Sequence, residues 1–109
     1  MPLDLPAPVR RYFEAERADD TNHMGDFFAT DATVTDERRT HTGLEAIRAW
    51  KQESKAATSY QVTPLKAEQV EGRFVVTGRV EGNFPGSPVN LRYFFRLSDD
   101  RIMSLEIRL

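Results

Sequence analysis

Residues Phe27–Asp36 read Phe-Phe-Ala-Thr-Asp-Ala-Thr-Val-Thr-Asp. Its second half alternates between threonines and other residues, which predicts a short β-strand over Ala32–Asp36. In such a strand Ala32, Val34 and Asp36 share one face. An acidic side chain on the same face as an apolar valine is unusual, so Asp36 is a candidate functional residue.

Two helices are predicted before this strand. Apolar residues at three- and four-residue spacing indicate the first one over about Pro8–Ala18, and Pro8 suits the first helical turn because its missing N–H is not needed there. A short second helix, capped by Asp20 or Thr21, is expected to follow and to end at Thr30–Asp31. The core residues of this second helix would be Met24, Phe27 and Phe28.

A third helix is predicted after the strand. The spacing of Thr42 and Glu45 is typical of a capping box, in which each side chain binds a backbone N–H at the start of a helix. The segment over Glu37–Thr42 would form a loop that leads into this helix. The apolar stripe of the third helix would consist of Leu44, Ile47 and Trp50.

From Ser59 onward the hydrophobic pattern changes to the period of two that strands show. Pro64 indicates a bulge or an edge strand, because proline cannot donate to a central ladder. Helices first and strands afterwards are typical of an α+β fold rather than of alternating βαβ units. The four predicted strands are Tyr60–Glu68, Arg73–Val80, Val89–Leu97 and Ile102–Leu109.

The size and charge of the chain limit its class. Its 109 residues predict a single domain over residues 1–109. The net charge of -2 argues against a nucleic-acid partner, which usually needs a basic face. The sequence shows no cysteine, no signal-peptide pattern and no apolar stretch near the ~20 residues that cross a bilayer. We therefore expect a cytoplasmic protein with no membrane partner.

Four segments together resemble a known superfamily. They are Arg11-Tyr-Phe-Glu14, Phe27–Asp36, Gly43-Leu-Glu-Ala-Ile-Arg-Ala-Trp50 and Leu97-Ser-Asp-Asp-Arg-Ile102. Their order and spacing resemble the nuclear transport factor 2-like superfamily over nearly the whole chain, and its SnoaL-like polyketide cyclase and ketosteroid isomerase branches in particular. This resemblance implies an α+β fold in which a curved antiparallel sheet wraps around three N-terminal helices and encloses a cone-shaped pocket.

The resemblance also implies catalytic roles for two residues. In ketosteroid isomerases a helix-one tyrosine donates a hydrogen bond to the substrate oxygen, and an aspartate at the end of the first strand moves the proton. Tyr12 and Asp36 stand in these places, 24 positions apart (36 − 12 = 24). The third residue of those enzymes is a protonated aspartate on a later strand. Here the matching position holds Tyr93, whose phenol could also donate a hydrogen bond.

Each of these residues also has a purely structural interpretation. Asp36 could cap the following loop or pair with Arg38 or Arg39. The hydroxyl of Tyr12 could lie at the surface beside a packed ring, and Tyr93 could be a core residue with a satisfied hydroxyl. His41 could reach the pocket mouth or remain a surface histidine. The expected apolar wall of the pocket consists of Phe27, Trp50, Leu91 and Phe95, which core packing would explain equally well.

No cofactor or metal is expected. No histidines and carboxylates have the spacing of a metal site such as His-x-x-x-His. The sequence also contains no glycine-rich phosphate loop and no Gly-x-Ser-x-Gly nucleophile elbow.

The sequence thus favours a pocket for a small apolar or carbonyl-containing molecule, with cofactor-independent proton transfer of the isomerase, cyclase or lyase type. The alternatives are a small-molecule binding protein without activity and a dimerisation module without a ligand. A homodimer is expected because Phe94, flanked by Arg92 and Arg96, makes the outer sheet face too apolar for plain solvent surface. The superfamily commonly pairs its sheets back to back through this face.

Overall fold

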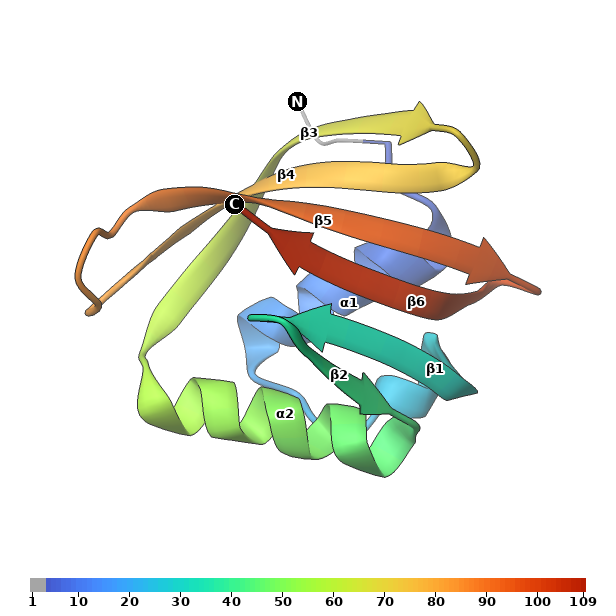
Figure 1. Cartoon of the computed structure of the whole chain (residues 1–109), viewed down its shortest axis with the longest axis horizontal. Helices are drawn as coiled ribbons and strands as arrows, with labels where there is room; N and C mark the ends of the chain where they lie inside the picture. The colour runs from blue at the N-terminus through green and yellow to red at the C-terminus, as the bar shows by residue number, and fades with distance from the viewer. Residues whose placement is uncertain (1–3) are drawn as a thin grey trace.

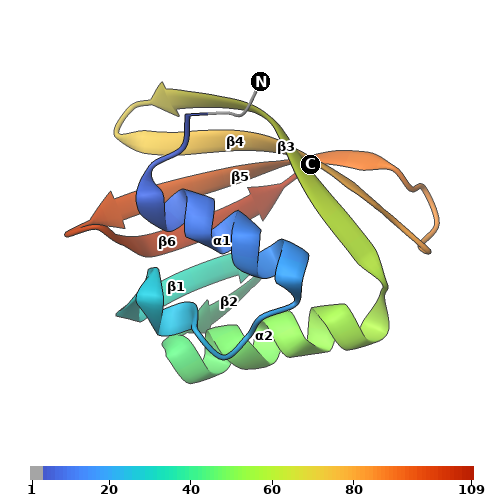
Figure 2. The same ribbon diagram turned by 180° about the vertical axis from the view of Figure 1, so that it is seen from behind.

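The computed structural model describes residues 4–109, which fold into two α-helices, one 3-10 turn and a six-stranded sheet. Figures 1 and 2 show that both helices cover the same concave face of a strongly curved sheet. This arrangement confirms the predicted α+β class. The elements are α1 (Ala7–Ala18), η1 (Met24–Asp26), β1 (Phe28–Asp36), β2 (Arg39–Thr42), α2 (Leu44–Ala57), β3 (Tyr60–Val70), β4 (Arg73–Gly82), β5 (Val89–Ser98) and β6 (Arg101–Arg108).

The strand order in the sheet is β2-β1-β6-β5-β4-β3. All neighbours are antiparallel, as predicted, except β1 and β6, which run parallel with Val34 opposite Leu105. The sheet is therefore mixed. Pro64 lies in an edge strand, and the register of β3 on β4 shifts between Pro64 and Lys66, so both structural readings of this proline are confirmed.

The predicted second helix is reduced to the single turn η1. Asp19 adopts a left-handed conformation (φ 55°) and ends α1, and Asp20 N donates to Ala15 O over 2.9 Å. Phe28 already belongs to β1, which is longer at its start than the alternating pattern indicated. The two phenylalanines are buried on the turn and the strand, and their spacing gave no sign of which element would hold them.

The predicted loop before the third helix is instead a hairpin. Glu37 (φ 52°) and Arg38 (φ 65°) form a tight turn of the kind that matches strand twist, and β2 pairs with β1 beyond it. The capping box is wrong, because Thr42 is the last residue of β2 and α2 has no side-chain cap. Gly43, at φ 89°, makes the corner between strand and helix, a conformation that L side chains rarely adopt.

An aromatic core fills the space between α1 and the sheet. The Tyr12 ring lies edge-to-face against Phe13, Phe28 and Phe95, with centroids 5.1, 6.0 and 5.5 Å away. Each such side chain contributes roughly 1.5–3 kcal/mol through burial. This packing fixes α1 across the sheet and leaves the end where β4 stops and β5 begins less filled.

Neither α1 nor α2 is long and apolar enough to cross a membrane, and no other helix of that length occurs within residues 4–109.

Candidate functional site

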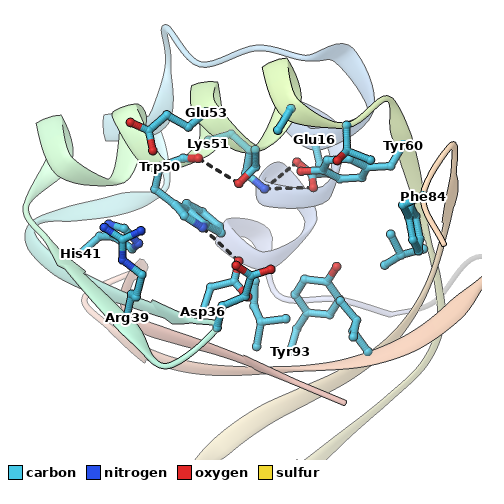
Figure 3. A pocket seen from close by; sticks show the side chains of 17 residues that line it. Glu16, Asp36, Arg39, His41, Trp50, Lys51, Glu53, Tyr60, Phe84 and Tyr93 are labelled. Carbon is cyan, nitrogen blue, oxygen red and sulfur yellow. Dashed lines mark hydrogen bonds and ion pairs between the residues drawn. The ribbon is translucent and has the colours of Figure 1, made fainter. Parts of the chain in front are cut away.

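A cavity of about 460 Å³ opens between α2 and the ends of the strands (Figure 3). This volume lies within the roughly 300–1,000 Å³ typical of small-molecule sites. The curvature of the sheet brings distant segments of the chain around it. The lining consists of Glu16, Asp36, Glu37, Arg39, His41, Trp50, Lys51, Glu53, Ser54, Ala57, Thr58, Tyr60, Val80, Phe84, Leu91, Tyr93 and Ile107.

The cavity has chemically different sides. Strand residues supply an apolar side, because inward positions alternate along β4, β5 and β6. Helix α2, the end of α1 and the end of β1 supply acids, an amine and an indole. A ligand that fits both sides has an apolar body and a polar end. The apolar side consists of Val80, Leu91 and Ile107 on the strands and of Phe84 in the loop between β4 and β5.

Asp36 lies at the end of β1 and lines the cavity. Because Ala32 and Val34 of the same strand face are fully buried, the strand alternation carries the Asp36 side chain inward as well. The Trp50 Nε1 donates a hydrogen bond to Asp36 Oδ2 over 3.1 Å, and Figure 3 shows this contact inside the cavity. Within residues 4–109 Asp36 forms no ion pair with Arg38 or Arg39. Its side-chain partner is the Trp50 indole.

Tyr93 rises from β5 into the same cavity. Figure 3 shows its hydroxyl directed away from the sheet, toward Glu16 and Lys51. The ring is only 3% exposed, and burial raises the pKa of the phenol, with the carboxylates of Glu16 and Asp36 adding to the shift. Tyr93 therefore remains a neutral hydrogen-bond donor at physiological pH.

A buried ion pair forms another part of the lining. Lys51 Nζ lies 3.0 Å from Glu16 Oε1 and 2.9 Å from Oε2, and both residues are 5% exposed. Only the contact to Oε1 has the geometry of a hydrogen bond, so Oε2 is an ion-pair partner rather than a well-aligned acceptor. Lys51 Nζ also donates to the Tyr12 hydroxyl over 3.3 Å. A charged pair at this depth is costly to desolvate and is a mark of functional sites.

Opposing effects act on the Lys51 amine. Burial lowers its pKa and outweighs the Glu16 carboxylate, which raises it, while the nearby charge of Lys55 lowers it further. Lys55 itself bonds to the Glu16 backbone oxygen over 3.0 Å and pairs with Asp19 at 2.9 Å. The Lys51 ammonium also lies over the Trp50 ring, 4.2 Å from the centroid.

The structure brings five of the eight predicted site residues to the cavity. These are Asp36, Tyr93, His41, Trp50 and Leu91, and the His41 ring lies 6.1 Å from the Trp50 ring. The remaining three, Tyr12, Phe27 and Phe95, belong to the core. They pack below the cavity because α1 presses its apolar stripe directly onto the sheet.

Tyr12 is separated from the cavity by the Glu16–Lys51 pair. It is 2% exposed, burial raises the pKa of its hydroxyl, and that hydroxyl accepts the bond from Lys51. Tyr12 and Phe27 line a separate small cavity of only about 10 Å³. In this structure Tyr12 contacts Lys51 and does not line the larger cavity.

Sequence reasoning missed Glu16, Lys51 and Tyr60. Glu16 follows Tyr12 by four residues and Lys51 follows Ile47 by four, so both charges interrupt an apolar helix stripe. Each of these two helices has one charged residue on its apolar stripe, and the charges are opposite. This pattern could have predicted a buried ion pair between the helices. Tyr60 gave no such signal, because a tyrosine at the start of a strand is common.

A metal centre finds no support in the part of the chain that the structure describes. Residues 4–109 contain no group of three or more histidine, cysteine, aspartate or glutamate side chains placed to hold a metal ion.

Comparisons with solved structures show which proteins share this architecture. A candidate polyketide cyclase of Sinorhizobium meliloti superposes with a TM-score of 0.91 at 43% identity, covering 96% of each chain. A protein of Catenulispora acidiphila with a ketosteroid isomerase-like fold, in complex with trimethylamine, superposes at 0.83 with 25% identity and covers 97% of this chain and 87% of its own. A cystatin-fold protein of Novosphingobium aromaticivorans, 16% identical, shares the fold (TM-score 0.80, covering 99% of this chain and 100% of its own).

A comparison with curated proteins finds no significant match. The sequence profile of the SnoaL-like domain, in contrast, matches residues 9–105. This span runs from the first turn of α1 to the middle of β6 and includes Asp36, Lys51 and Tyr93. Because this profile covers most of the chain and the overall fold matches that of the Sinorhizobium meliloti protein, the chain belongs to the SnoaL-like domain family.

Proposed function

We propose that the cavity takes a small, largely apolar carbonyl compound and that Asp36 removes and returns a proton on the carbon next to the carbonyl group. The observation that carries this proposal is the position of the Asp36 carboxylate, which lies inside the cavity, is held by the Trp50 indole and shares the space with the Tyr93 hydroxyl. General base catalysis needs a carboxylate of this kind within reach of a C–H bond.

The carboxylate and the phenol have complementary roles in this scheme. The Trp50 hydrogen bond engages Oδ2, and Oδ1 makes no hydrogen bond within residues 4–109, so one oxygen remains to take the proton. Tyr93, kept neutral by burial, donates to the carbonyl oxygen as negative charge develops there. The apolar side formed by Leu91 and Ile107 holds the body of the ligand and excludes water.

The two most informative relatives support a small-molecule site. The Sinorhizobium meliloti protein is a candidate polyketide cyclase, and the Catenulispora acidiphila protein is in complex with trimethylamine. In this chain Lys51 and Lys55 already lie over the Trp50 and Tyr60 rings, each 4.2 Å from the centroid. Since these aromatic faces have their cations, a neutral carbonyl ligand fits better than an amine.

Hydrogen exchange tests the proposal. Phenylacetone and 2-tetralone, ketones with activated α-protons, are incubated with the protein in heavy water and followed by proton NMR. Exchange above the buffer rate is expected for wild type and for Asp31→Asn, an exposed control on the same strand. Asp36→Asn is expected to abolish it. Equal rates for wild type and Asp36→Asn would exclude Asp36 as the base.

A non-catalytic carrier is the second candidate, favoured by the single carboxylate that lies deep in the cavity without an ion-pair partner within residues 4–109. Such a carrier would bind the ketones and be stabilised by RT ln(1 + [L]/Kd), without exchange. Thermal shift and exchange measured on the same samples therefore separate the two functions.

The outer sheet face supports a further proposal, a homodimer. The Phe94 ring is half-buried beneath the guanidinium groups of Arg73, Arg92 and Arg108, 5.1–5.5 Å from its centroid. Val75, opposite Phe94 on the neighbouring strand, is buried without joining the main core. A two-fold axis would set this patch against its copy. A cytoplasmic location remains a prediction.

A further inference from the structure

The proton-transfer scheme leaves the most unusual group of the cavity without a function. Lys51 is a primary amine buried in the cavity lining, and a lysine is almost never buried to this extent without a specific partner. Stability alone is a weak reason for such a pair, because well-packed apolar side chains are often equally stabilising.

Every element packed around Lys51 contributes a group that acts on its proton. Helix α1 supplies Glu16 at 3.0 Å and Tyr12 at 3.3 Å, α2 supplies the positive charge of Lys55, and β1 supplies the charge of Asp36. The net effect of burial and of Lys55 is a lowered pKa for the amine. The Glu16 carboxylate lies 3.0 Å from the Lys51 nitrogen, within reach of its proton.

These conditions are those of a nucleophilic lysine, desolvated and next to a second cationic group. We propose that Lys51 is a covalent anchor in this cavity, and that its amine condenses with the carbonyl carbon of an aldehyde or ketone to form an iminium ion. The inference rests on the proposed function, since it takes the same carbonyl ligand. It narrows the ligand class, because carboxylates and esters do not form this product.

The step balances without an oxidant or a reductant. The lone pair of the Lys51 nitrogen forms a C–N bond, and the carbonyl C–O bond breaks. Two of the three protons of the ammonium group leave with the oxygen as water, and the third stays on the iminium nitrogen. Glu16 carries protons between nitrogen and oxygen and then faces the positive charge of the iminium at the distance it now keeps to the ammonium group.

An iminium also supplies what the cavity otherwise lacks. Its positive nitrogen draws electrons from the neighbouring carbon, so the α-proton that Asp36 removes becomes more acidic. A second carboxylic acid that hydrogen-bonds the substrate oxygen is then unnecessary. Tyr93, directed toward the same pair, can donate to the oxygen as it departs.

Reductive trapping tests this directly. Native protein is mixed with phenylacetone and sodium cyanoborohydride at neutral pH, and the alkylated lysines are located by peptide mapping. The chain has three lysines, and the exposed Lys66 on β3 is the internal control. A lowered pKa leaves more of the Lys51 amine unprotonated at neutral pH. We therefore expect Lys51 to be labelled faster than Lys66, and Lys51→Arg to lose only that label.

Three outcomes decide the matter. Labelling confined to Lys66 and the N-terminal amine in folded protein would overturn the inference, and this readout needs no variant that folds. Preferential labelling of Lys51 together with absent α-proton exchange would keep the anchor and reject Asp36 as the base. Exchange that depends on Asp36 but persists in Lys51→Arg, without labelling, would keep the proposed function and reject the anchor.

Discussion

The Glu16–Lys51 pair is the most informative feature at the scale of single residues. Two charges that each occupy a place on an apolar helix stripe are tolerated because they meet at 2.9–3.0 Å. Removing one partner leaves the other charge uncompensated in the interior. The effect of the pair on the free energy of unfolding can therefore be measured independently of any chemical role.

Glu16→Gln is expected to lower the free energy of unfolding by about 3–5 kcal/mol, because Lys51 then loses its counter-charge. The double variant Glu16→Gln with Lys51→Met is expected to recover most of this loss, since neither charge remains. Urea unfolding monitored by tryptophan fluorescence measures both. Equal stability of Glu16→Gln and wild type would show that the Lys51 charge does not need Glu16 as its partner.

The tyrosines predict the behaviour of the protein in alkali. Burial is the largest cause that raises the pKa above the ordinary 10.0 for all three tyrosines, Tyr12, Tyr60 and Tyr93. A raised pKa in the folded state contributes stability that is fully present below pH 10 and is lost as the pH rises above it. Lys51 acts in the opposite direction. Burial lowers the pKa of its amine below the ordinary 10.5, so the cost of burying the charge disappears as the pH rises and the amine loses its proton.

Spectrophotometric titration checks this expectation. Folded protein should show no tyrosinate absorbance near pH 10, and all three phenols should ionise in one step with alkaline unfolding. The same protein in concentrated urea should titrate near pH 10. Gradual ionisation of a tyrosine in folded protein would mean that its hydroxyl is hydrated.

At the scale of elements, the position of Tyr93 depends on a glycine in the neighbouring strand. A Cβ atom at Gly78 of β4 would lie 2.9 Å from Tyr93 Cε1 and 3.1 Å from Val62 Cγ1. The absence of a side chain at Gly78 therefore leaves room for the Tyr93 ring, whose hydroxyl points into the cavity. This is a close approach of a ring to a backbone, for which only glycine leaves room.

Gly78→Ala is expected to displace the Tyr93 ring, to cost about 1–3 kcal/mol through overpacking, and to slow α-proton exchange. Gly25→Ala is the matched control, because its Cβ would meet only Leu44 Cδ1 at an ordinary 3.5 Å. Thermal unfolding and NMR exchange on both variants make the comparison. If Gly78→Ala matched the control in both, the Tyr93 ring would not need its present place.

The elements that could be predicted are those whose sequence carries a complete pattern. Strict alternation over Val89–Leu97 specified β5 and its faces, and the same logic placed Asp36 inward. The capping box was wrong because Thr42, which has the right spacing to Glu45, is the last residue of β2 and pairs with Thr33 of β1. The second helix failed because two adjacent phenylalanines suit a strand start as well as a helix.

At the scale of the whole molecule, the sequence did not predict the parallel pairing of two strands or the residues that meet at the cavity. The parallel contact of β1 with β6 joins segments about seventy positions apart, and no local pattern states such a direction. The cavity likewise arises where Glu16, Asp36, Lys51 and Tyr93 converge on the concave face. Helix and strand periodicity gave the inward face of each residue, but not which inward residues would meet.

The outer face yields a prediction about assembly. If two copies pair through Phe94, the arginines around each ring approach their copies, and this repulsion weakens the dimer. Sedimentation at micromolar concentration is expected to show a dimer that is tightened by added salt. Phe94→Glu should be a monomer. At concentrations low enough for wild type to be monomeric too, both proteins should have the same thermal unfolding profile. A wild-type monomer at every salt concentration would reject the interface.

The most direct test of the central claim is the ratio of α-proton exchange rates between wild type and Asp36→Asn, measured by NMR with phenylacetone in heavy water. A positioned general base contributes roughly 10²–10⁴-fold. Because the Asp36 carboxylate lies in the cavity beside Trp50, we predict a ratio of at least about 100. A ratio near one would contradict the claim.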